Sequence, residues 1–309
     1  MTRVLITGAA GLVGRPLVAK LAGHEVVASD LMQGELPVDV PFERLDVTGD
    51  DPDRLIAKHQ PEVVVHLASI VTPPPGMSRD TAYAVDVTGT QNILNAAQKH
   101  GVRRVVVTSS GAAYGYHADN PVPLAEDAPC RGNPEFAYAD HKRRVEEMLA
   151  VARRDHPALE QVVLRVCTVL GEGAENQITA LFRKPRIIAI RGADSPFVFI
   201  WTEDLARILR RAAVDGPVGI FNVAGDGVMG VDDIARALGK PVMRLPAMAL
   251  KAALAVAGPL GLSRYGPEQV KFLQYRPVLA NGALKGEFGY QPEKTSAEVF
   301  DLWRNWAGL

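Results

Sequence analysis

The chain has 309 residues, of which 47% are hydrophobic and 22% charged, a composition typical of a folded globular protein and not of a disordered one. Its 34 basic and 35 acidic residues give a net charge of −1, without the basic excess that recruits phosphate backbones, so we expect no nucleic-acid partner. The two cysteines, Cys130 and Cys167, have no disulfide-framework or zinc-site spacing, which favours a reducing, cytoplasmic compartment and no bound metal.

The first half of the chain alternates short apolar runs with helical patterns. Nearly continuous β-branched runs predict five strands, at residues 4–7, 25–29, 63–67, 104–109 and 161–165. Helical spacing predicts helices between them, at residues 16–22, 54–59, 83–100 and 136–154. Because strands without polar alternation are buried on both faces, this pattern predicts an α/β fold with a doubly wound parallel sheet of the Rossmann type.

Beyond Val166 the pattern loosens, with shorter helices and frequent Gly and Pro. We therefore expect a dinucleotide-binding domain over residues 1–166 and a smaller, mixed C-terminal lobe over residues 167–309, with some later segments returning to the sheet. The apolar run from Ala247 to Leu262 is interrupted by Lys251 and is too short to span a bilayer, which takes about 20 apolar residues. We expect an amphipathic or buried helix there and no integral membrane segment; peripheral membrane contact is the alternative.

Residues 7–14, Thr-Gly-Ala-Ala-Gly-Leu-Val-Gly, follow the first predicted strand and begin the first predicted helix. Gly8 permits a tight turn, Gly11 lets the backbone approach a pyrophosphate, and Gly14 lets helix and strand pack closely. The free N–H groups at the helix start then face the anion. This context predicts a dinucleotide site that includes Ala10, Leu12 and Val13.

Asp30 lies at the end of the second predicted strand. A carboxylate at this place accepts hydrogen bonds from ribose hydroxyls and repels a 2′-phosphate, so the sequence predicts NAD and not NADP as the cofactor. Asp46 and Val47, after the next short strand, could flank the adenine.

Tyr138 and Lys142 lie four residues apart on one predicted helix, so both side chains project from the same face. A nearby ammonium favours phenolate and is expected to lower the tyrosine pKa from about 10, which suits a general acid/base for alcohol–ketone interconversion. Ser110 ends the fourth strand, and ligands in open parallel sheets lie beyond the carboxyl ends of strands. We therefore expect Ser110 to hold the substrate oxygen.

These motifs together resemble the extended short-chain dehydrogenase/reductase family, which includes NAD-dependent epimerases and dehydratases, over nearly the whole chain. The matching segments are residues 7–14, Asp30, residues 66–69, 86–92, 109–115, 138–142 and 199–204. The resemblance implies that Tyr138 transfers the proton, that Lys142 contacts the nicotinamide ribose and tunes Tyr138, and that Ser110 orients the substrate oxygen. It implies further cofactor contacts by Leu67, Ala68, Ser69, Thr108, Arg165, Val166 and Thr168, besides Tyr138 and Lys142. It also implies a homodimer through the helices from Tyr83 to His100 and from Phe136 to Arg154.

The chain departs from the sugar-nucleotide pattern of that family at several positions. Thr168 stands where the family has Asn, Glu172 where it has Pro, Asp86 where it has another Asn, and Phe197 where an Arg helps to hold nucleotide phosphates. An aromatic ring cannot pair with a diphosphate as Arg does. These departures favour a less polar substrate that contacts Phe197; the alternative is that Phe197, Phe199 and Trp201 simply belong to the core.

Three other features leave alternatives open. Tyr114 lines the substrate pocket or belongs to the core. Arg183 or Arg191 could still supply a phosphate contact from elsewhere in the chain. We interpret His66, at the end of a buried strand, as structural, and assign His141 no role.

Three functions follow, in order of preference. The first is an NAD-dependent oxidoreductase that transfers hydride to or from the hydroxyl or carbonyl of a small, partly apolar substrate. The alternative is a sugar-nucleotide epimerase or dehydratase that keeps and recycles its NAD. The third is a non-catalytic NAD-binding scaffold, against which the Ser110, Tyr138 and Lys142 set argues, because a scaffold needs no proton relay.

Overall fold

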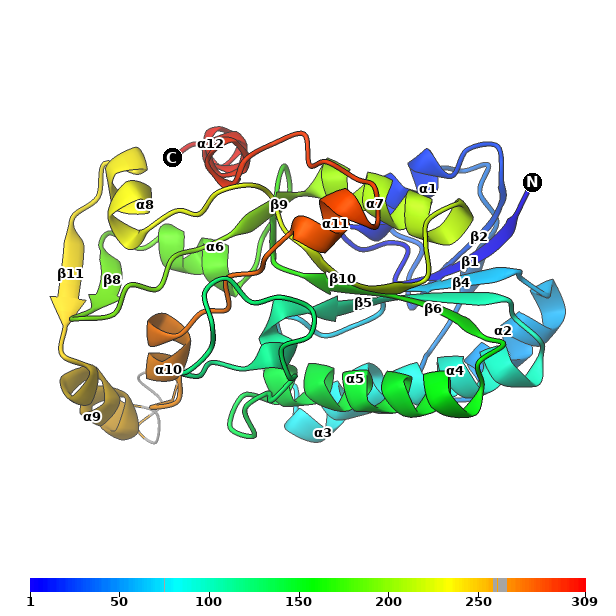
Figure 1. The fold of residues 1–309 in the computed structure, drawn as a ribbon, viewed down its shortest axis with the longest axis horizontal. Coiled ribbons are helices and arrows are strands. Elements are labelled where there is room, and N and C mark those ends of the chain that lie inside the picture. The colour runs from blue at the N-terminus through cyan, green and yellow to red at the C-terminus, as the bar shows by residue number, and fades with distance from the viewer. Residues whose placement is uncertain (75, 258–259, 261–265) are drawn as a thin grey trace.

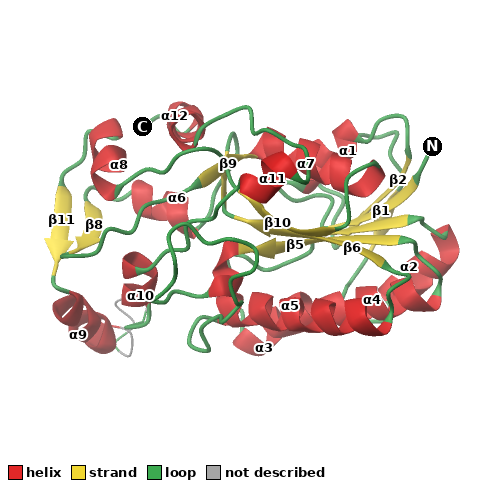
Figure 2. Cartoon of the chain, viewed as in Figure 1, coloured by secondary structure: helices red, strands yellow, loops and turns green. Residues whose placement is uncertain are grey.

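The computed structural model describes residues 1–74, 76–257, 260 and 266–309. Its centre is a parallel sheet of seven strands in the order β10–β6–β5–β4–β1–β2–β3 (Figures 1 and 2). These strands are β1 (Arg3–Thr7), β2 (Glu25–Asp30), β3 (Phe42–Arg44), β4 (Val63–His66), β5 (Arg104–Ser110), β6 (Glu160–Val166) and β10 (Gly219–Val223). The predicted doubly wound parallel sheet is confirmed.

Helices cover both faces of this sheet (Figure 1). One face carries α1 (Gly14–Lys20), α7 (Thr202–Val214) and α11 (Gly282–Gly286). The other face carries α2 (Asp51–His59), α3 (Arg79–Tyr83), α4 (Gly89–Lys99) and α5 (Ala137–Asp155). Ile6 packs in the first of these two cores and its neighbour Leu5 in the second, since successive strand side chains point to opposite faces. Burial on both faces explains why the strand sequences show no polar alternation.

The region from Tyr83 to His100 is not the single regular helix that its spacing predicts. A π-helical turn, η1 (Ala84–Thr88), separates α3 from α4. Such turns insert an extra residue into the helical repeat and often occur at functional sites. Here the turn carries the buried Asp86.

The C-terminal half adds short parallel strand pairs beyond one end of the main sheet (Figure 2). The pairs are β7 (Thr168–Leu170) with β9 (Phe199–Trp201), and β8 (Ile187–Ile190) with β11 (Val242–Leu245). Around them lie α6 (Gln177–Phe182), α8 (Val231–Ala237), α9 (Ala247–Ala257), α10 (Gln269–Gln274) and α12 (Ser296–Trp306). A 3-10 turn, η2 (Gly111–Tyr114), follows β5 and packs against α5. Strand β10 instead returns to the main sheet, where Phe221 pairs with Leu164 of β6.

Helix α9 occupies most of the apolar run from Ala247 to Leu262; residues 258–259 and 261–262 of that run lie outside the described residues. Leu250 and Leu254 pack toward α10, whereas Met248 and Val256 are exposed. None of the helices in the described part of the chain has both the length and the apolar character needed to span a bilayer.

An aromatic cluster holds the C-terminal helix α12 against the smaller strand pairs. Phe182 lies at its centre, with its ring centroid 5.6 Å from that of Trp303 and 5.4 Å from that of Phe300. The Trp303 indole N–H donates a hydrogen bond to the backbone oxygen of Ala174 at 3.1 Å. Large buried aromatic side chains with a satisfied polar atom contribute strongly to core stability.

We therefore predict that Trp303→Ala lowers the free energy of unfolding by about 3–5 kcal/mol, because it leaves a cavity and an unpaired carbonyl. Urea unfolding followed by circular dichroism measures this change. Trp306→Ala on the same helix is the matched control, since its side chain is 44% exposed, and should change stability by no more than about 0.5 kcal/mol. Equal losses in the two variants would contradict the structural role given to the cluster.

Candidate active site

A pocket of about 670 Å³ lies along the carboxyl edge of the main sheet. Its walls come from the turn after β1, the ends of β4, β5 and β6, the start of α5 and several C-terminal segments. Many residues that the sequence predicts for the site line it: Gly8, Gly11, Leu12, Val13, Gly14, Leu67, Ser69, Thr108, Ser110, Tyr138, Lys142, Val166, Thr168 and Phe197.

The three glycines of the first turn are required for different reasons. Gly8 has a positive φ of 73°, and a Cβ atom there would lie 2.7 Å from the amide nitrogen of Ala68. A Cβ atom on Gly14 would lie 2.4 Å from the carbonyl oxygen of Gly8. Gly11 is exposed, and its Cβ would meet only that same oxygen, at 3.3 Å. Gly8 and Gly14 thus allow the turn to pack, and Gly11 leaves room over it for a ligand.

Asp30 lies beside this turn, where its carboxylate accepts hydrogen bonds from the amides of Ala10 at 3.1 Å and Leu31 at 2.7 Å. Asp46 is farther along the edge, and its carboxylate accepts two hydrogen bonds from Thr48, which lower the pKa of Asp46. Val47 is buried against Gly89. Of the predicted cofactor residues, Ala10, Asp30, Asp46, Val47, Ala68 and Arg165 do not line the pocket itself.

Ser110, Tyr138 and Lys142 meet on one side of the pocket, at the end of β5 and the start of α5. The ammonium nitrogen of Lys142 donates a hydrogen bond to the carbonyl oxygen of Thr108 at 2.9 Å and lies 5.7 Å from the centroid of the Tyr138 ring. The Ser110 hydroxyl accepts a hydrogen bond from the Ala112 amide at 3.1 Å.

The electrostatics of this group differ from the sequence-based expectation. Burial raises the pKa of Tyr138; the hydrogen bond with Ser110 opposes this shift, and the negative charge of Asp86 adds to it. Burial also lowers the pKa of Lys142, which Asp86 and Glu146 counteract. Burial of the phenol thus raises the pKa of Tyr138, contrary to the lowering expected from a nearby ammonium.

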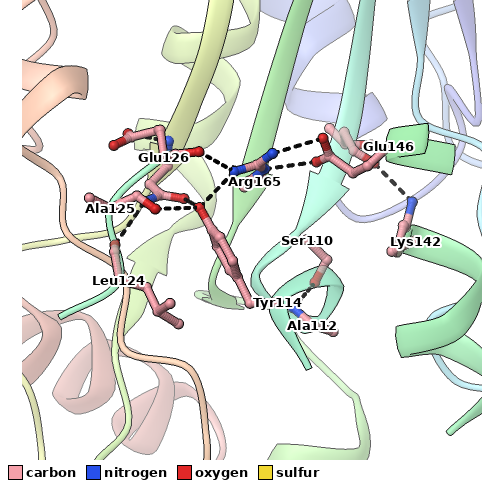
Figure 3. Close-up of polar contacts among 11 residues, drawn as sticks. Ser110, Ala112, Tyr114, Leu124, Ala125, Glu126, Lys142, Glu146 and Arg165 are labelled. Atoms are coloured by element: carbon pink, nitrogen blue, oxygen red, sulfur yellow. Dashed lines mark hydrogen bonds and ion pairs between the residues drawn. The ribbon is translucent and has the colours of Figure 1, made fainter. Parts of the chain in front are cut away.

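Arg165 and Tyr114 lie away from the pocket, in a buried network beneath it (Figure 3). The Arg165 guanidinium pairs with both carboxylate oxygens of Glu146, at 2.9 and 3.0 Å, and donates to the Tyr114 hydroxyl at 2.9 Å. The Tyr114 hydroxyl in turn donates to the side-chain oxygen of Asn222 at 2.8 Å. Of the two alternatives for Tyr114, the structure supports the core, because its side chain is buried and does not line the pocket. The expected cofactor contact of Arg165 is corrected: Arg165 points away from the wall that Val166 lines, since neighbouring strand residues face opposite sides.

Arg276, which no sequence pattern indicated, enters the pocket wall from the C-terminal region. The carbon at the centre of its guanidinium lies 3.8 Å from the centroid of the Phe197 ring, and its amide donates to the Ser195 hydroxyl at 3.0 Å. Burial lowers the pKa of Arg276 to about 9. Arg276 follows α10 in an irregular segment, where no spacing marks it as a site residue.

Among the described residues that line the pocket, the basic side chains are those of Lys142 and Arg276. Arg183 and Arg191, which the sequence offered for a phosphate contact, do not line it. Arg183 pairs with Glu175 at 2.7 Å, and Arg191 donates to the Arg244 carbonyl at 3.3 Å.

Two histidines near the site are buried. His66 hydrogen-bonds Thr7 at 2.7 Å through one ring nitrogen and Thr90 at 3.1 Å through the other, which agrees with a structural role. His141, to which the sequence assigned no role, contacts the carboxylate of Asp86 at 2.9 Å. This pair was missed because its two members are 55 residues apart.

Comparisons with solved structures agree with this architecture. A UDP-glucose 4-epimerase from Thermotoga maritima, solved with UDP-glucose, is similar with a TM-score of 0.76 at 20% identity, over 99% of this chain and 98% of that one. A UDP-glucose 4-epimerase from Thermus thermophilus, in complex with NAD, is similar with a TM-score of 0.74 at 23% identity, over 99% of both chains.

Sequence comparisons point the same way. An uncharacterized protein of Mycobacterium bovis is 26% identical over 99% of this chain and 84% of its own length. A UDP-glucose 4-epimerase of Mycolicibacterium smegmatis is 36% identical over 45% of this chain and 48% of its own length. Residues 4–224 match the NAD dependent epimerase/dehydratase family. Since this match covers most of the chain, including the glycine turn and the Ser110, Tyr138 and Lys142 set, the protein belongs to the NAD-dependent epimerase/dehydratase family.

Proposed function

We propose that this protein binds NAD and uses it to oxidise a hydroxyl-bearing carbon of a small substrate, with Tyr138 as the general acid/base. The observation that carries the proposal is that a single pocket joins the glycine turn to Ser110, Tyr138 and Lys142. A dinucleotide held by the turn would therefore reach the proton-transfer group without leaving the pocket.

The residues present fit the dinucleotide. Gly11 leaves open space over the turn for a pyrophosphate, and the Asp30 carboxylate, beside the turn, would accept hydrogen bonds from the adenosine ribose. Leu67, Ser69 and Val166 form the walls between the turn and Tyr138. The Asp30 charge would repel a 2′-phosphate, which supports NAD over NADP.

The side chains would share the proton chemistry, while bound NAD supplies the hydride acceptor. The Ser110 hydroxyl would donate a hydrogen bond to the substrate oxygen, and Tyr138 would accept the proton of the substrate hydroxyl. Lys142, held by the Thr108 carbonyl, would favour the phenolate form of Tyr138 by its positive charge. The reverse step would return the proton from Tyr138 to the oxygen.

We favour an enzyme that recycles its NAD over one that releases it after a net oxidation, which reverses our first preference. Both named structural relatives and the named sequence relative are UDP-glucose 4-epimerases, which supports the epimerase or dehydratase alternative. The substrate would carry an anionic group near Arg276, which supplies a pocket cation although Phe197 stands at the family's Arg position. Phosphate and carboxylate groups are the usual partners of Arg.

The first prediction concerns the turn. Gly14→Ala places a methyl group 2.4 Å from the Gly8 oxygen, so the turn must shift and NAD affinity should fall at least about tenfold. Isothermal titration with NAD measures this. Gly49→Ala, at a glycine with open space around it, should leave the affinity unchanged. Unchanged affinity in Gly14→Ala would contradict the assignment of the turn.

The second prediction concerns Tyr138. Tyr138→Phe removes the proton-transfer group but keeps the ring, so turnover should fall about a hundredfold or more while NAD affinity stays within about twofold. A panel of sugar nucleotides and alcohols provides the assay. Tyr275→Phe, which removes a phenol outside the pocket, is the control. Full turnover in Tyr138→Phe would disprove the catalytic assignment.

The third prediction separates the two modes of NAD use. If NAD is recycled, the purified protein should still contain it after prolonged dialysis, since the cofactor never needs to leave between turnovers. Absorbance and mass spectrometry of the denatured supernatant measure the retained NAD. Loss of NAD on dialysis, together with net reduction of added NAD by an alcohol, would instead support an oxidoreductase that releases its cofactor after each turnover.

A further inference from the structure

Asp86 and His141 form a buried pair directly behind the pocket wall. Their side chains are each 1% exposed, and the carboxylate oxygen Oδ2 of Asp86 lies 2.9 Å from Nδ1 of His141. Asp86 belongs to the π-helical turn η1, and His141 immediately precedes Lys142 on α5. The pair therefore links η1 to α5, two elements that are far apart in sequence. Its α5 member, His141, is the residue next to Lys142.

The second oxygen of Asp86 holds the pocket wall. Oδ1 accepts hydrogen bonds from the Ser69 hydroxyl and from the Ile70 amide, both at 2.8 Å. Ser69 and Ile70 line the pocket. The carboxylate thus has three partners, and these hydrogen bonds help to lower the pKa of Asp86 against the cost of burial.

Lys142 is a buried ammonium without a direct ion-pair partner among the described residues. Its residue is 5% exposed, and its hydrogen bond goes to the uncharged carbonyl of Thr108. Glu146, one helical turn away, is engaged with the Arg165 guanidinium through both oxygens. A buried charge is costly unless a charge of opposite sign lies near it, so Lys142 needs another source of negative charge.

The hydrogen bonds of His141 indicate that Asp86 is this source. The other ring nitrogen of His141, Nε2, is buried and has no hydrogen-bond partner within the described part of the chain. A charged imidazolium would carry an N–H donor on Nε2 and leave it unsatisfied, which is expensive in the interior. A neutral ring that donates from Nδ1 to Asp86 leaves only an acceptor lone pair on Nε2, which costs less than the unpaired N–H of a charged ring. The negative charge of Asp86 is then not cancelled by His141.

We propose that Asp86, oriented by a neutral His141, is the buried counter-charge that keeps Lys142 protonated at the pocket. Asp86 and His141 are thus positioning residues, and their importance for turnover rests on the function proposed above.

The other titratable groups that face Lys142 do not replace this charge. Glu146 is paired with Arg165, and burial raises the pKa of Tyr138. His66 is neutral, since burial and the nearby Lys142 lower the pKa of His66 to about 3. Asp86 and Glu146 are the two groups whose charges raise the pKa of Lys142 against the effect of burial.

The test is the titration of Lys142 itself, which needs no substrate. Acetic anhydride acetylates neutral amines, and mass spectrometry of the peptide that contains Lys142 gives the rate between pH 7 and pH 10. Asp86→Asn keeps the shape and an acceptor oxygen but removes the charge. The pH midpoint of Lys142 labelling should fall by roughly one pH unit. At a pH below the midpoint, the fraction of neutral amine and therefore the rate of acetylation should rise about tenfold.

Two further variants make the result specific. Asp140→Asn is the matched control, because Asp140 is also a buried carboxylate on α5, but its charge is balanced by Arg143 and Arg144; it should leave the midpoint unchanged. His141→Asn replaces a neutral donor by another neutral donor and should also leave it unchanged. If His141 were instead a charged partner of Asp86, this variant would raise the midpoint.

An unmoved midpoint in Asp86→Asn, or a raised one in His141→Asn, would overturn the proposal. Repeating the labelling on protein freed of NAD by denaturation and refolding, with and without added NAD, distinguishes this failure from failure of the proposed function. NAD should slow acetylation of Lys142 by occupying the pocket. Absence of protection would count against the cofactor site, whereas the comparison of midpoints between variants would still decide the role of Asp86.

Discussion

The constraint on which this structure depends is the parallel arrangement of its main sheet. Every strand of such a sheet ends at the same edge, so the loops that follow β1, β4, β5 and β6 meet there although they are far apart in sequence. The glycine turn and Ser110 reach one pocket for this reason. The same arrangement buries the strands on both faces, which makes the sheet a rigid base for the site.

The helix α5 must satisfy a second constraint, because it brings charged groups into the interior. Glu146 binds Arg165 of β6 (Figure 3). Asp140 binds arginines on its own helix. Lys142 projects toward the pocket without such a partner among the described residues, next to the Asp86–His141 pair. Each buried charge on this helix therefore has a compensating charge either in contact or nearby, and these interactions also fix how α5 lies against the sheet.

The C-terminal half supplies the part of the pocket wall that contains Phe197 and Arg276. Phe197 belongs to the aromatic cluster around Phe182 and also supports the guanidinium of Arg276 at the pocket wall. Phe197 and Arg276 thus lie together at one place in the pocket. Stacking on an aromatic face stabilises a guanidinium and fixes its plane, so a substrate anion would meet a pre-oriented partner.

The sequence by itself determined the features that depend on local periodicity and backbone sterics: the buried strands, the Gly8–Gly14 turn and the placement of Tyr138 and Lys142 on one helix face. Only the tertiary structure decided which side Arg165 faces, that Tyr114 belongs to the core, that Arg276 reaches the pocket and that Asp86 meets His141. The physical reason is that spacing along the chain predicts neighbours within one element. Contacts between elements and the desolvation of charges depend on packing across the whole fold.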